Sequence, residues 1–341
     1  MKVTDTRRLK RAKVELTALG MGSAPLGGLY APVPLADARA ALSAAWQAGI
    51  RHFDTAPMYG LGRSEHLMGE LLREETEGFV LSTKVGRLMS FERPGRQLPA
   101  EAQKNEFDSG WHNGLPFREV FDYSYDAILR SYDDSRQRTG LGRLDILFVH
   151  DIGKVTHGER HDHHWQALTR GGGFRALEEL RDGGLIAGFG LGVNENEVIL
   201  DAMEEADLDV CLLAGRYTLI DGSAAEALLP RALERDVALV MGGVFNSGIL
   251  ASSSGRKKYN YVDAPAEILA KADALEAVCR EFSVPLPAAA IQFPMRHPAT
   301  GNVVIGAKTA TQVKQNVAWF EQDIPQAFWT SLEDKGLIPA V

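Results

Sequence analysis

Short apolar runs alternate with longer amphipathic stretches along most of the chain. The apolar runs, which predict strands, lie at 16–21, 50–53, 79–83, 144–149, 186–191, 209–213, 237–241 and 303–305. The amphipathic stretches, which predict helices, lie near 35–48, 64–74, 118–138, 173–182, 195–205, 223–235, 264–282 and 309–319. Eight strands that each precede a helix favour a closed parallel (β/α)8 TIM barrel over an open sheet. No linker rich in Gly, Ser or Pro divides the chain, so we expect one domain over 1–341.

The predicted connections differ in length at the two ends of the strands. Turns from a helix back to a strand are short, as at Ala48-Gly49 and Asp182-Gly183-Gly184. The connections after the third, fourth and seventh strands are long, at about 86–117, 151–172 and 242–263. Structureless loops of this length inside a compact domain are usually lids or binding loops. All three follow strands, so we expect them at the C-terminal face of the barrel, where barrel enzymes keep their sites.

Composition and charge narrow the class of function. The 341 residues are 45% hydrophobic and 24% charged, which is ordinary for a globular protein. A net charge of −8 argues against general affinity for nucleic acids or anionic membranes. The basic cluster of Arg7, Arg8, Lys10, Arg11 and Lys13 is better explained as a solvated N-terminal β-hairpin. No apolar signal core or run of ~18 apolar residues is present, so we expect a soluble, cytoplasmic monomer or small homo-oligomer.

Four residues with proton-transfer chemistry lie just beyond the ends of predicted strands. Asp54 and Tyr59 follow the second strand, Lys84 ends the third, and His150 ends the fourth. Because the ends of parallel barrel strands meet at one mouth, we expect these side chains to lie together. A nearby ammonium lowers the pKa of a phenol from its usual value of ~10. Lys84 is therefore expected to make Tyr59 a competent acid or base, with Asp54 holding Lys84 and His150 orienting the substrate oxygen.

The spacing of these four residues resembles the catalytic tetrad of the aldo-keto reductase family. The resemblance runs from about residue 8 to 320 and implies an NAD(P)H molecule extended across the barrel mouth. A cofactor is required in any case, because these side chains move a proton but cannot accept a hydride. Several blocks, including 121–126, 213–220 and 245–250, are closest to a branch of the family that oxidises aldoses or pyridoxal.

The resemblance assigns the cofactor to segments at the mouth. Gly22-Ser23 would lie beneath the nicotinamide ribose, Asn194 would bind the carboxamide, 243–250 the pyrophosphate and 304–316 the adenosine phosphate. The residues expected to contact the cofactor are Gly22, Ser23, Asp54, Asn194, Tyr217, Gly243, Val244, Phe245, Ser247, Gly248, Leu250, Ile305, Gly306, Lys308, Gln312 and Asn316.

Two departures from the family pattern and two lysines bear on how the cofactor is held. Gly242 and Ala214 stand where many relatives carry a stacking aromatic and a carboxamide-binding glutamine. Either another aromatic stacks on the nicotinamide, with Tyr217 as the candidate, or the nicotinamide is held more loosely. Lys308 and Lys314 have no acidic neighbour in sequence and slightly favour NADP, with NAD left open.

Other patterns have less specific explanations. One predicted loop carries four histidines: His157, His161, His163 and His164. Their spacing fits no common zinc site and they have no cysteine partner, so we expect them to be solvated and to bind no metal. Gly20-Met21-Gly22 and Gly190-Leu191-Gly192 do not form a dinucleotide fingerprint and are interpreted as tight turns at the mouth. Cys211 lies in an apolar run and is expected to be a buried free thiol.

The function expected from these observations is NAD(P)-dependent oxidation of an aldose at C1 to its lactone. Tyr59, His150, Trp111 and His112 would face this small-molecule substrate, although Trp111 and His112 could equally anchor their loop. Oxidation of pyridoxal, whose cyclic hemiacetal also yields a lactone, or general carbonyl reduction is the first alternative. A nucleotide-sensing subunit without turnover is the second.

Overall fold

Eight parallel strands close into a barrel in the computed structural model, which describes residues 1–75, 78–90, 111–252, 258–260 and 262–340. In barrel order the strands are β3 (Leu19–Gly22), β4 (His52–Asp54), β5 (Val80–Val85), β8 (Ile146–His150), β9 (Gly188–Val193), β10 (Val210–Ala214), β11 (Ala238–Gly242) and β14 (Thr300–Gly306). Pairing of β14 with β3 closes the barrel. The predicted (β/α)8 fold is confirmed, and each strand lies within a few residues of its predicted run.

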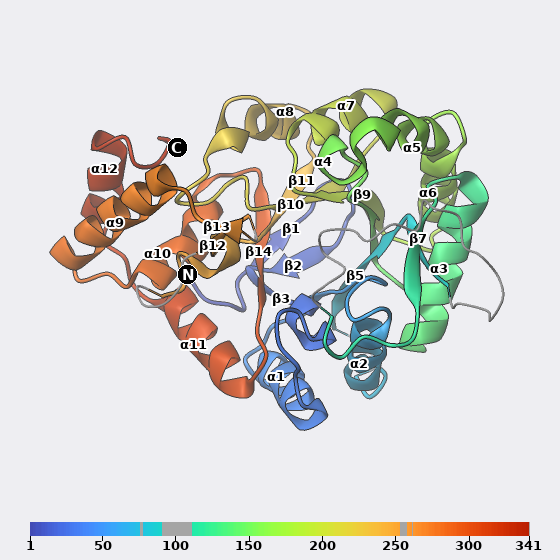
Figure 1. Ribbon diagram of the computed structural model, residues 1–341, viewed down its shortest axis with the longest axis horizontal. Helices are drawn as coiled ribbons and strands as arrows, with labels where there is room; N and C mark the ends of the chain where they lie inside the picture. Colours follow the sequence, from blue (N-terminus) through green and yellow to red (C-terminus); the bar gives the residue numbers. More distant parts are fainter. Residues whose placement is uncertain (76–77, 91–110, 253–257, 261, 341) are drawn as a thin grey trace.

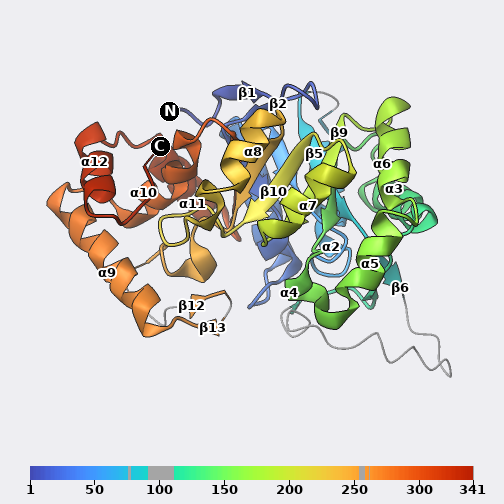
Figure 2. The ribbon, with the colours of Figure 1, turned by 90° about the horizontal axis from the view of Figure 1, so that it is seen from above.

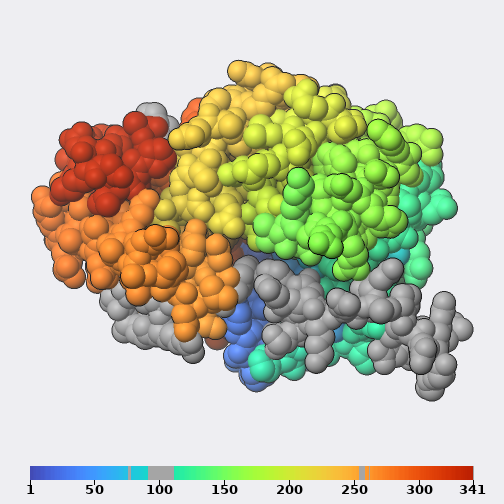
Figure 3. All heavy atoms as spheres, turned by 45° about the horizontal axis from the view of Figure 1, so that its top comes forward, coloured from blue at the N-terminus to red at the C-terminus, as the bar shows by residue number. Residues whose placement is uncertain are grey.

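Helices surround the barrel on its outside (Figure 1). They are α1 (Leu35–Gln47), α2 (Arg63–Leu72), α3 (Tyr125–Thr139), α6 (Gly173–Asp182), α7 (Glu197–Glu205), α8 (Leu228–Glu234), α9 (Ala266–Glu281), α10 (Leu286–Gln292), α11 (Ala310–Glu321) and α12 (Gln326–Asp334). Helix α3 begins later than predicted, because 118–121 forms a strand instead. In the space-filling view, α9 in orange and α12 in red form one side of the molecule (Figure 3).

Two apolar cores follow from the alternation of side chains along the strands. On β8, Ile146 and Phe148 belong to a cluster inside the barrel, whereas Leu147 and Val149 pack between the strands and the helices. Cys211 lies in the outer layer and is a buried free thiol, as expected.

A two-stranded hairpin, β1 (Thr6–Arg8) with β2 (Glu15–Thr17), precedes the barrel, which confirms the predicted N-terminal hairpin. Its Leu9 and Leu16 belong to the interior cluster, so the hairpin plugs the barrel. The basic residues are less solvated than predicted: Arg7 donates to the carbonyl oxygen of Thr300, and Arg11 pairs with Asp207. Figure 2 shows the hairpin at one end of the barrel and the strands of the long loops at the other.

The long connections carry secondary structure of their own. After β5, β6 (Arg87–Ser90) pairs antiparallel with β7 (Arg118–Phe121), and residues 91–110 between them lie outside the described part. The connection after β8 holds α4 (Lys154–His157), η2 (Gly158–Arg160) and α5 (His161–Leu168). Short β12 (Lys258–Tyr259) and β13 (Val262–Asp263) follow β11. Short 3-10 turns complete the chain: η1 (Ala24–Gly27), η3 (Ser223–Ala225), η4 (Asn246–Gly248) and η5 (Phe293–Arg296).

The expectation of solvated loop histidines was wrong for three of the four. His157, His161 and His164 are at most 8% exposed, because α4 and α5 fold back over the end of β8. The hydroxyl of Tyr123 forms a hydrogen bond of 2.9 Å with His157 Nε2. The ring centres of His157 and His164 lie 4.2 Å apart. Within the described residues no three His, Cys, Asp or Glu side chains are arranged to hold a metal.

The sequence predicts tight turns at the mouth for the two glycine pairs, and this prediction is wrong. Gly20 and Gly22 lie within β3, and Gly190 and Gly192 lie within β9. A Cβ atom at Gly190 would lie 1.9 Å from the carbonyl oxygen of Val210 on the neighbouring strand. These glycines therefore let strands and side chains approach closely.

Among the described residues, no helix has the length and apolar character that crossing a membrane requires.

Candidate active site

Closure of the barrel divides the predicted site residues between two arcs of its mouth. The consecutive strands β4, β5 and β8 supply Asp54 with Tyr59, Lys84 and His150. The consecutive strands β11, β14 and β3 carry the three segments expected to bind most of the nucleotide. Asn194 directly follows β9, which lies beside β8. The proposed proton-transfer groups and the proposed cofactor segments are therefore neighbours.

Lys84 lies at the centre of the first arc in a buried ion pair. Its ammonium donates to Asp54 Oδ2 at 2.7 Å and to the carbonyl oxygen of Thr55 at 2.9 Å. It also lies 4.7 Å from the centre of the Tyr59 ring. Burial is the largest single effect and acts to lower the pKa of Lys84, but the charges and hydrogen bonds of Asp54 and Tyr59 together outweigh it, so the pKa is raised. An ammonium has three donors, and after Asp54 and Thr55 one remains for Tyr59.

Tyr59 differs from the sequence prediction in its acidity. Burial raises the pKa of its phenol more than the charge of Lys84 lowers it, and the charge of Asp54 raises it further. The expectation of a pKa below the usual value was therefore wrong. The reason is desolvation: a phenolate loses more on leaving water than one paired ammonium returns.

His150 completes the group as a neutral imidazole. Its ring stands edge-on to Tyr59 with the ring centres 6.0 Å apart. Burial, followed by the positive charges of Arg87 and Lys84, holds the pKa of His150 well below its usual value. Its Nδ1 atom has no hydrogen-bond partner among the described residues. A neutral imidazole in this place can hydrogen bond a substrate oxygen without adding charge.

The second arc has features that fit an anionic dinucleotide. In the turn after β11, Asn246, Ser247 and Gly248 all have positive φ angles, and a Cβ atom at Gly248 would meet nothing within 4 Å. The buried Oδ1 of Asn246 has no partner among the described residues. Helix α11 begins after Thr309, whose side chain accepts from the backbone N–H of Gln312. An open turn and a helix N-terminus next to Lys308 suit phosphate groups.

A model of one known family covers most of the chain. The aldo/keto reductase family model matches residues 18–336. The chain belongs to the aldo/keto reductase family. As a member with dehydrogenase relatives, it is an NAD(P)-dependent oxidoreductase.

Two curated relatives and one solved structure illustrate the similarity. The chain is 60% identical over 339 residues to a pyridoxal 4-dehydrogenase of Microbacterium luteolum, covering 99% of both chains. It is 38% identical over 331 residues to a D-threo-aldose 1-dehydrogenase of a Pseudomonas species, covering 96% of both. A holo aldo-keto reductase structure from Bacillus halodurans has a TM-score of 0.73 at 21% identity, with 99% of this chain and 97% of that chain covered, and supports the fold.

Three residues that the sequence predicts to contact the cofactor have partners within the protein. The Tyr217 ring is 2% exposed and packs against Phe293, with ring centres 4.8 Å apart, so the structure does not support stacking on nicotinamide. Ser23 is fully buried, and its hydroxyl donates to the carbonyl oxygen of Asp54 while accepting from Ser64. Ser23 thus supports the strand that carries Asp54. The Lys308 ammonium donates to the carbonyl oxygen of Leu29 at 2.8 Å.

Trp111 and His112 come from the long connection after β5. The Trp111 ring is tilted over Tyr59, with ring centres 5.8 Å apart. Its backbone forms an isolated bridge to Leu29, and the N–H of His112 donates to the carbonyl oxygen of Gly28. Trp111 therefore both faces the tetrad and anchors its loop, whereas His112 is exposed.

Sequence reasoning missed a buried ion-pair cluster beside His150. Arg87 is 1% exposed, and its guanidinium bonds Glu119 at 2.7 Å and also Asp151. Burial acts to lower the pKa of Arg87, but the carboxylates of Glu119 and Asp151 raise it above its usual value. The cluster ties β6 and β7 to the end of β8. The available signal was position, since Arg87 follows Lys84 by three residues and Asp151 directly follows His150.

A close contact between two glycines shapes the loop that carries Tyr59. Gly60 has a φ of +63°, and a Cβ atom there would lie 2.7 Å from the Cα of Gly27. We expect Gly60→Ala to lower the free energy of unfolding by about 1–3 kcal/mol and to reduce kcat, because it adds strain and parts the two loops. Thermal unfolding and kcat measure this. Gly78→Ala is the matched control, since φ is +82° there but no atom lies within 4 Å. Equal loss of kcat in both variants would contradict a specific role for the contact.

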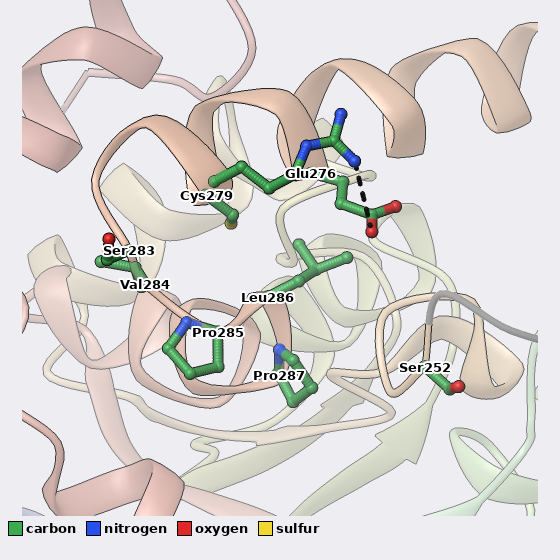
Figure 4. Close-up of a pocket in the computed structure, with 9 residues that line it drawn as sticks. Ser252, Glu276, Cys279, Ser283, Val284, Pro285, Leu286 and Pro287 are labelled. Atoms are coloured by element: carbon green, nitrogen blue, oxygen red, sulfur yellow. Dashed lines mark ion pairs between the residues drawn. The ribbon is translucent and has the colours of Figure 1, made fainter.

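A separate pocket of about 310 Å³ lies on the outside of the barrel, where α9 meets α10 (Figure 4). Cys279, Val284 and Leu286 line its apolar part, and the Glu276–Arg280 ion pair borders it. None of the tetrad residues lines this pocket, so it is distinct from the candidate active site.

Proposed function

We propose that this oxidoreductase oxidises a cyclic hemiacetal to a lactone, and that its substrate is pyridoxal. The observation that carries the proposal is the 60% identity, over 99% of both chains, to a relative named pyridoxal 4-dehydrogenase. Identity to the aldose dehydrogenase is 38%. The sequence alone placed an aldose first. Aldoses and pyridoxal share the same reacting group, a ring carbon that bears both a hydroxyl and a hydrogen.

The geometry supports assigning Tyr59 as the acid–base residue of this reaction. The hemiacetal hydroxyl binds between the Tyr59 hydroxyl and the neutral imidazole of His150. Tyr59 as phenolate takes the hydroxyl proton, while Lys84, held by Asp54, stabilises the negative charge on the phenolate. The segments after β11, β14 and β3 would hold NAD(P)⁺, which would supply the hydride acceptor for the ring carbon that bears the hydroxyl. The Trp111 ring covers one face of the substrate ring.

The two directions of the reaction should depend on pH in opposite ways. Because the pKa of Tyr59 is raised above the usual value of a phenol, ~10, the phenolate is a minority species at neutral pH. The rate of the chemical step in oxidation should rise from about pH 6 to about pH 10, whereas reduction, which needs the phenol, should stay constant until that pKa is reached. Single-turnover measurements in both directions test this. A plateau in oxidation below about pH 8 would show that another group is the base.

The substrate is tested by direct comparison. Purified protein is incubated with pyridoxal, L-fucose, L-galactose and D-arabinose, each with NAD⁺ and with NADP⁺, while absorbance of the reduced nicotinamide is followed. We expect the highest kcat/KM with pyridoxal and a lactone product by mass spectrometry. We expect NADP to be preferred, because Lys308 lies at the start of α11 and can pair with a 2′-phosphate. A kcat/KM at least about tenfold higher with an aldose would overturn the choice of substrate.

A further inference from the structure

A chain of buried hydrogen bonds runs beneath the tetrad, inside the barrel. The Nδ2 atom of Asn302 on β14 lies 2.7 Å from His52 Nδ1 on β4. His52 Nε2 lies 3.2 Å from Ser82 Oγ on β5, and that hydroxyl donates to Asp54 Oδ1 at 2.8 Å. His52, Ser82 and Asn302 are fully buried. The chain therefore ends on the carboxylate that holds Lys84.

Thr17 settles the direction of this chain. The same Nδ2 atom of Asn302 lies 3.2 Å from the carbonyl oxygen of Thr17, which can only accept, so the amide group must be the donor there. His52 Nδ1 consequently accepts from Asn302 and carries no proton. Burial, followed by the charge of Lys84, lowers the pKa of His52 to about 3, so the ring is neutral. Its proton then lies on Nε2 and is donated to Ser82, which leaves the single Ser82 hydrogen for Asp54.

Gly20 on β3 keeps the path of this chain open. Strand β3 lies between β14 and β4, so the contact between Asn302 and His52 passes over it. A Cβ atom at Gly20 would lie 2.9 Å from His52 Nδ1 and 3.0 Å from Asn302 Nδ2. A side chain at this position would displace one of the two partners, which accounts for a glycine inside a strand.

We propose that Asn302, His52 and Ser82 are positioning residues for proton transfer at Tyr59, a proposal that rests on the function proposed above. They act through Asp54, whose two carboxylate oxygens have separate tasks. Oδ1 accepts from Ser82 and Oδ2 accepts from Lys84, so the carboxylate plane is held from both sides. In a buried site such aligned donors strengthen one another. The orientation of Asp54 in turn directs the remaining Lys84 donor towards Tyr59.

The tautomer of His52 can be measured without any activity assay. In protein labelled with [15N]histidine and free of cofactor, the His52 signals are assigned by their loss in His52→Gln. We expect a neutral ring protonated on Nε2 that stays neutral until the pH approaches its pKa of about 3. In Asn302→Leu the Nδ1 atom loses its donor, so its signal should move. A ring protonated on Nδ1, or charged at neutral pH, in the unmodified protein would overturn the proposal.

Kinetics of isosteric variants give the second test. Asn302→Leu and Ser82→Ala should lower kcat by roughly 10- to 100-fold, the effect of a lost hydrogen bond to a charged group, with the nucleotide KM changed less than about twofold. Ser82→Thr keeps the hydroxyl and should restore most of the loss. The matched control is Thr300→Val, on β14 like Asn302. It loses the buried hydrogen bond from the Thr300 hydroxyl to the carbonyl oxygen of Pro294, which is not part of the hydrogen-bond chain beneath the tetrad. If the first two variants retain the kcat of this control, the positioning role is wrong.

Two further comparisons keep the outcomes separate. If Asn302→Leu does not fold, Gly20→Ala serves in its place, because its methyl group parts Asn302 from His52 and should cause the same fall in kcat. Tyr59→Phe with normal turnover would defeat the proposed function itself. An inactive Tyr59→Phe together with normal kcat in Asn302→Leu, or in Gly20→Ala, and Ser82→Ala would defeat only the positioning role.

Discussion

Tyr59→Phe should lower kcat for hemiacetal oxidation by roughly two to four orders of magnitude, the usual share of general acid–base catalysis. The change removes one hydroxyl and leaves the ring in place against Trp111 and His150. Within the described residues, the Tyr59 hydroxyl has one hydrogen-bond partner, Lys84. Nucleotide affinity, measured by fluorescence titration, should therefore remain close to that of the unmodified protein.

Tyr132→Phe is the matched control for this variant. Its hydroxyl also makes a hydrogen bond, to the carbonyl oxygen of Leu185, but on the outer helix α3. We expect it to keep normal kcat. Near-normal turnover of Tyr59→Phe on the best substrate would remove Tyr59 from the mechanism, whereas loss of nucleotide binding would show that the variant is damaged more widely.

Lys84→Met should have the largest combined effect on stability and activity. Lys84 is 1% exposed and Asp54 is 3% exposed, so removing the ammonium leaves a buried carboxylate without its ion-pair partner. Breaking a buried ion pair in this way costs about 3–5 kcal/mol. Activity should fall as well, because the charge that stabilises the Tyr59 phenolate is lost. Denaturant unfolding and kcat measure the two effects.

The double variant Asp54→Asn with Lys84→Met separates these two effects. Asp54→Asn replaces the unpaired buried carboxylate by a neutral amide, so most of the stability lost in Lys84→Met should return. Turnover should stay low, because neither variant supplies a cation to Tyr59. Recovery of activity together with stability would indicate that Lys84 serves folding alone and has no part in the chemistry.

The barrel and its mouth could be predicted because they depend on local patterns. Alternating apolar runs and amphipathic stretches set the order of strands and helices, and parallel strands bring their C-terminal ends to one face. Asp54 and His150 each end a strand and Lys84 is the last residue but one of β5, so their meeting follows from topology. The distance of 2.7 Å between the Lys84 and Asp54 side chains agrees with that expectation.

The acidity of Tyr59 and the state of the loop histidines could not be predicted, because both depend on burial. The ammonium of Lys84 was expected to dominate the pKa of Tyr59, but desolvation is the larger effect and appears only once the site is enclosed. His157 and His164 lie in a polar stretch of sequence and yet are buried against Tyr123 and Phe121. Helices α4 and α5 create that enclosure, and the loop pattern contained no sign of them.

The chain alone determined the order of elements and the family resemblance, and it was enough to predict the four candidate catalytic residues. Each of these is a matter of residue type and spacing. The tertiary structure decided which side chains lose water and which distant strands meet. Pairing of β14 with β3 brings Asn302 to His52 across Gly20, and folding of the β6–β7 arm brings Glu119 and Asp151 to Arg87. Such contacts join residues far apart in sequence, and their energies depend on desolvation, which is a property of the folded molecule and not of any segment.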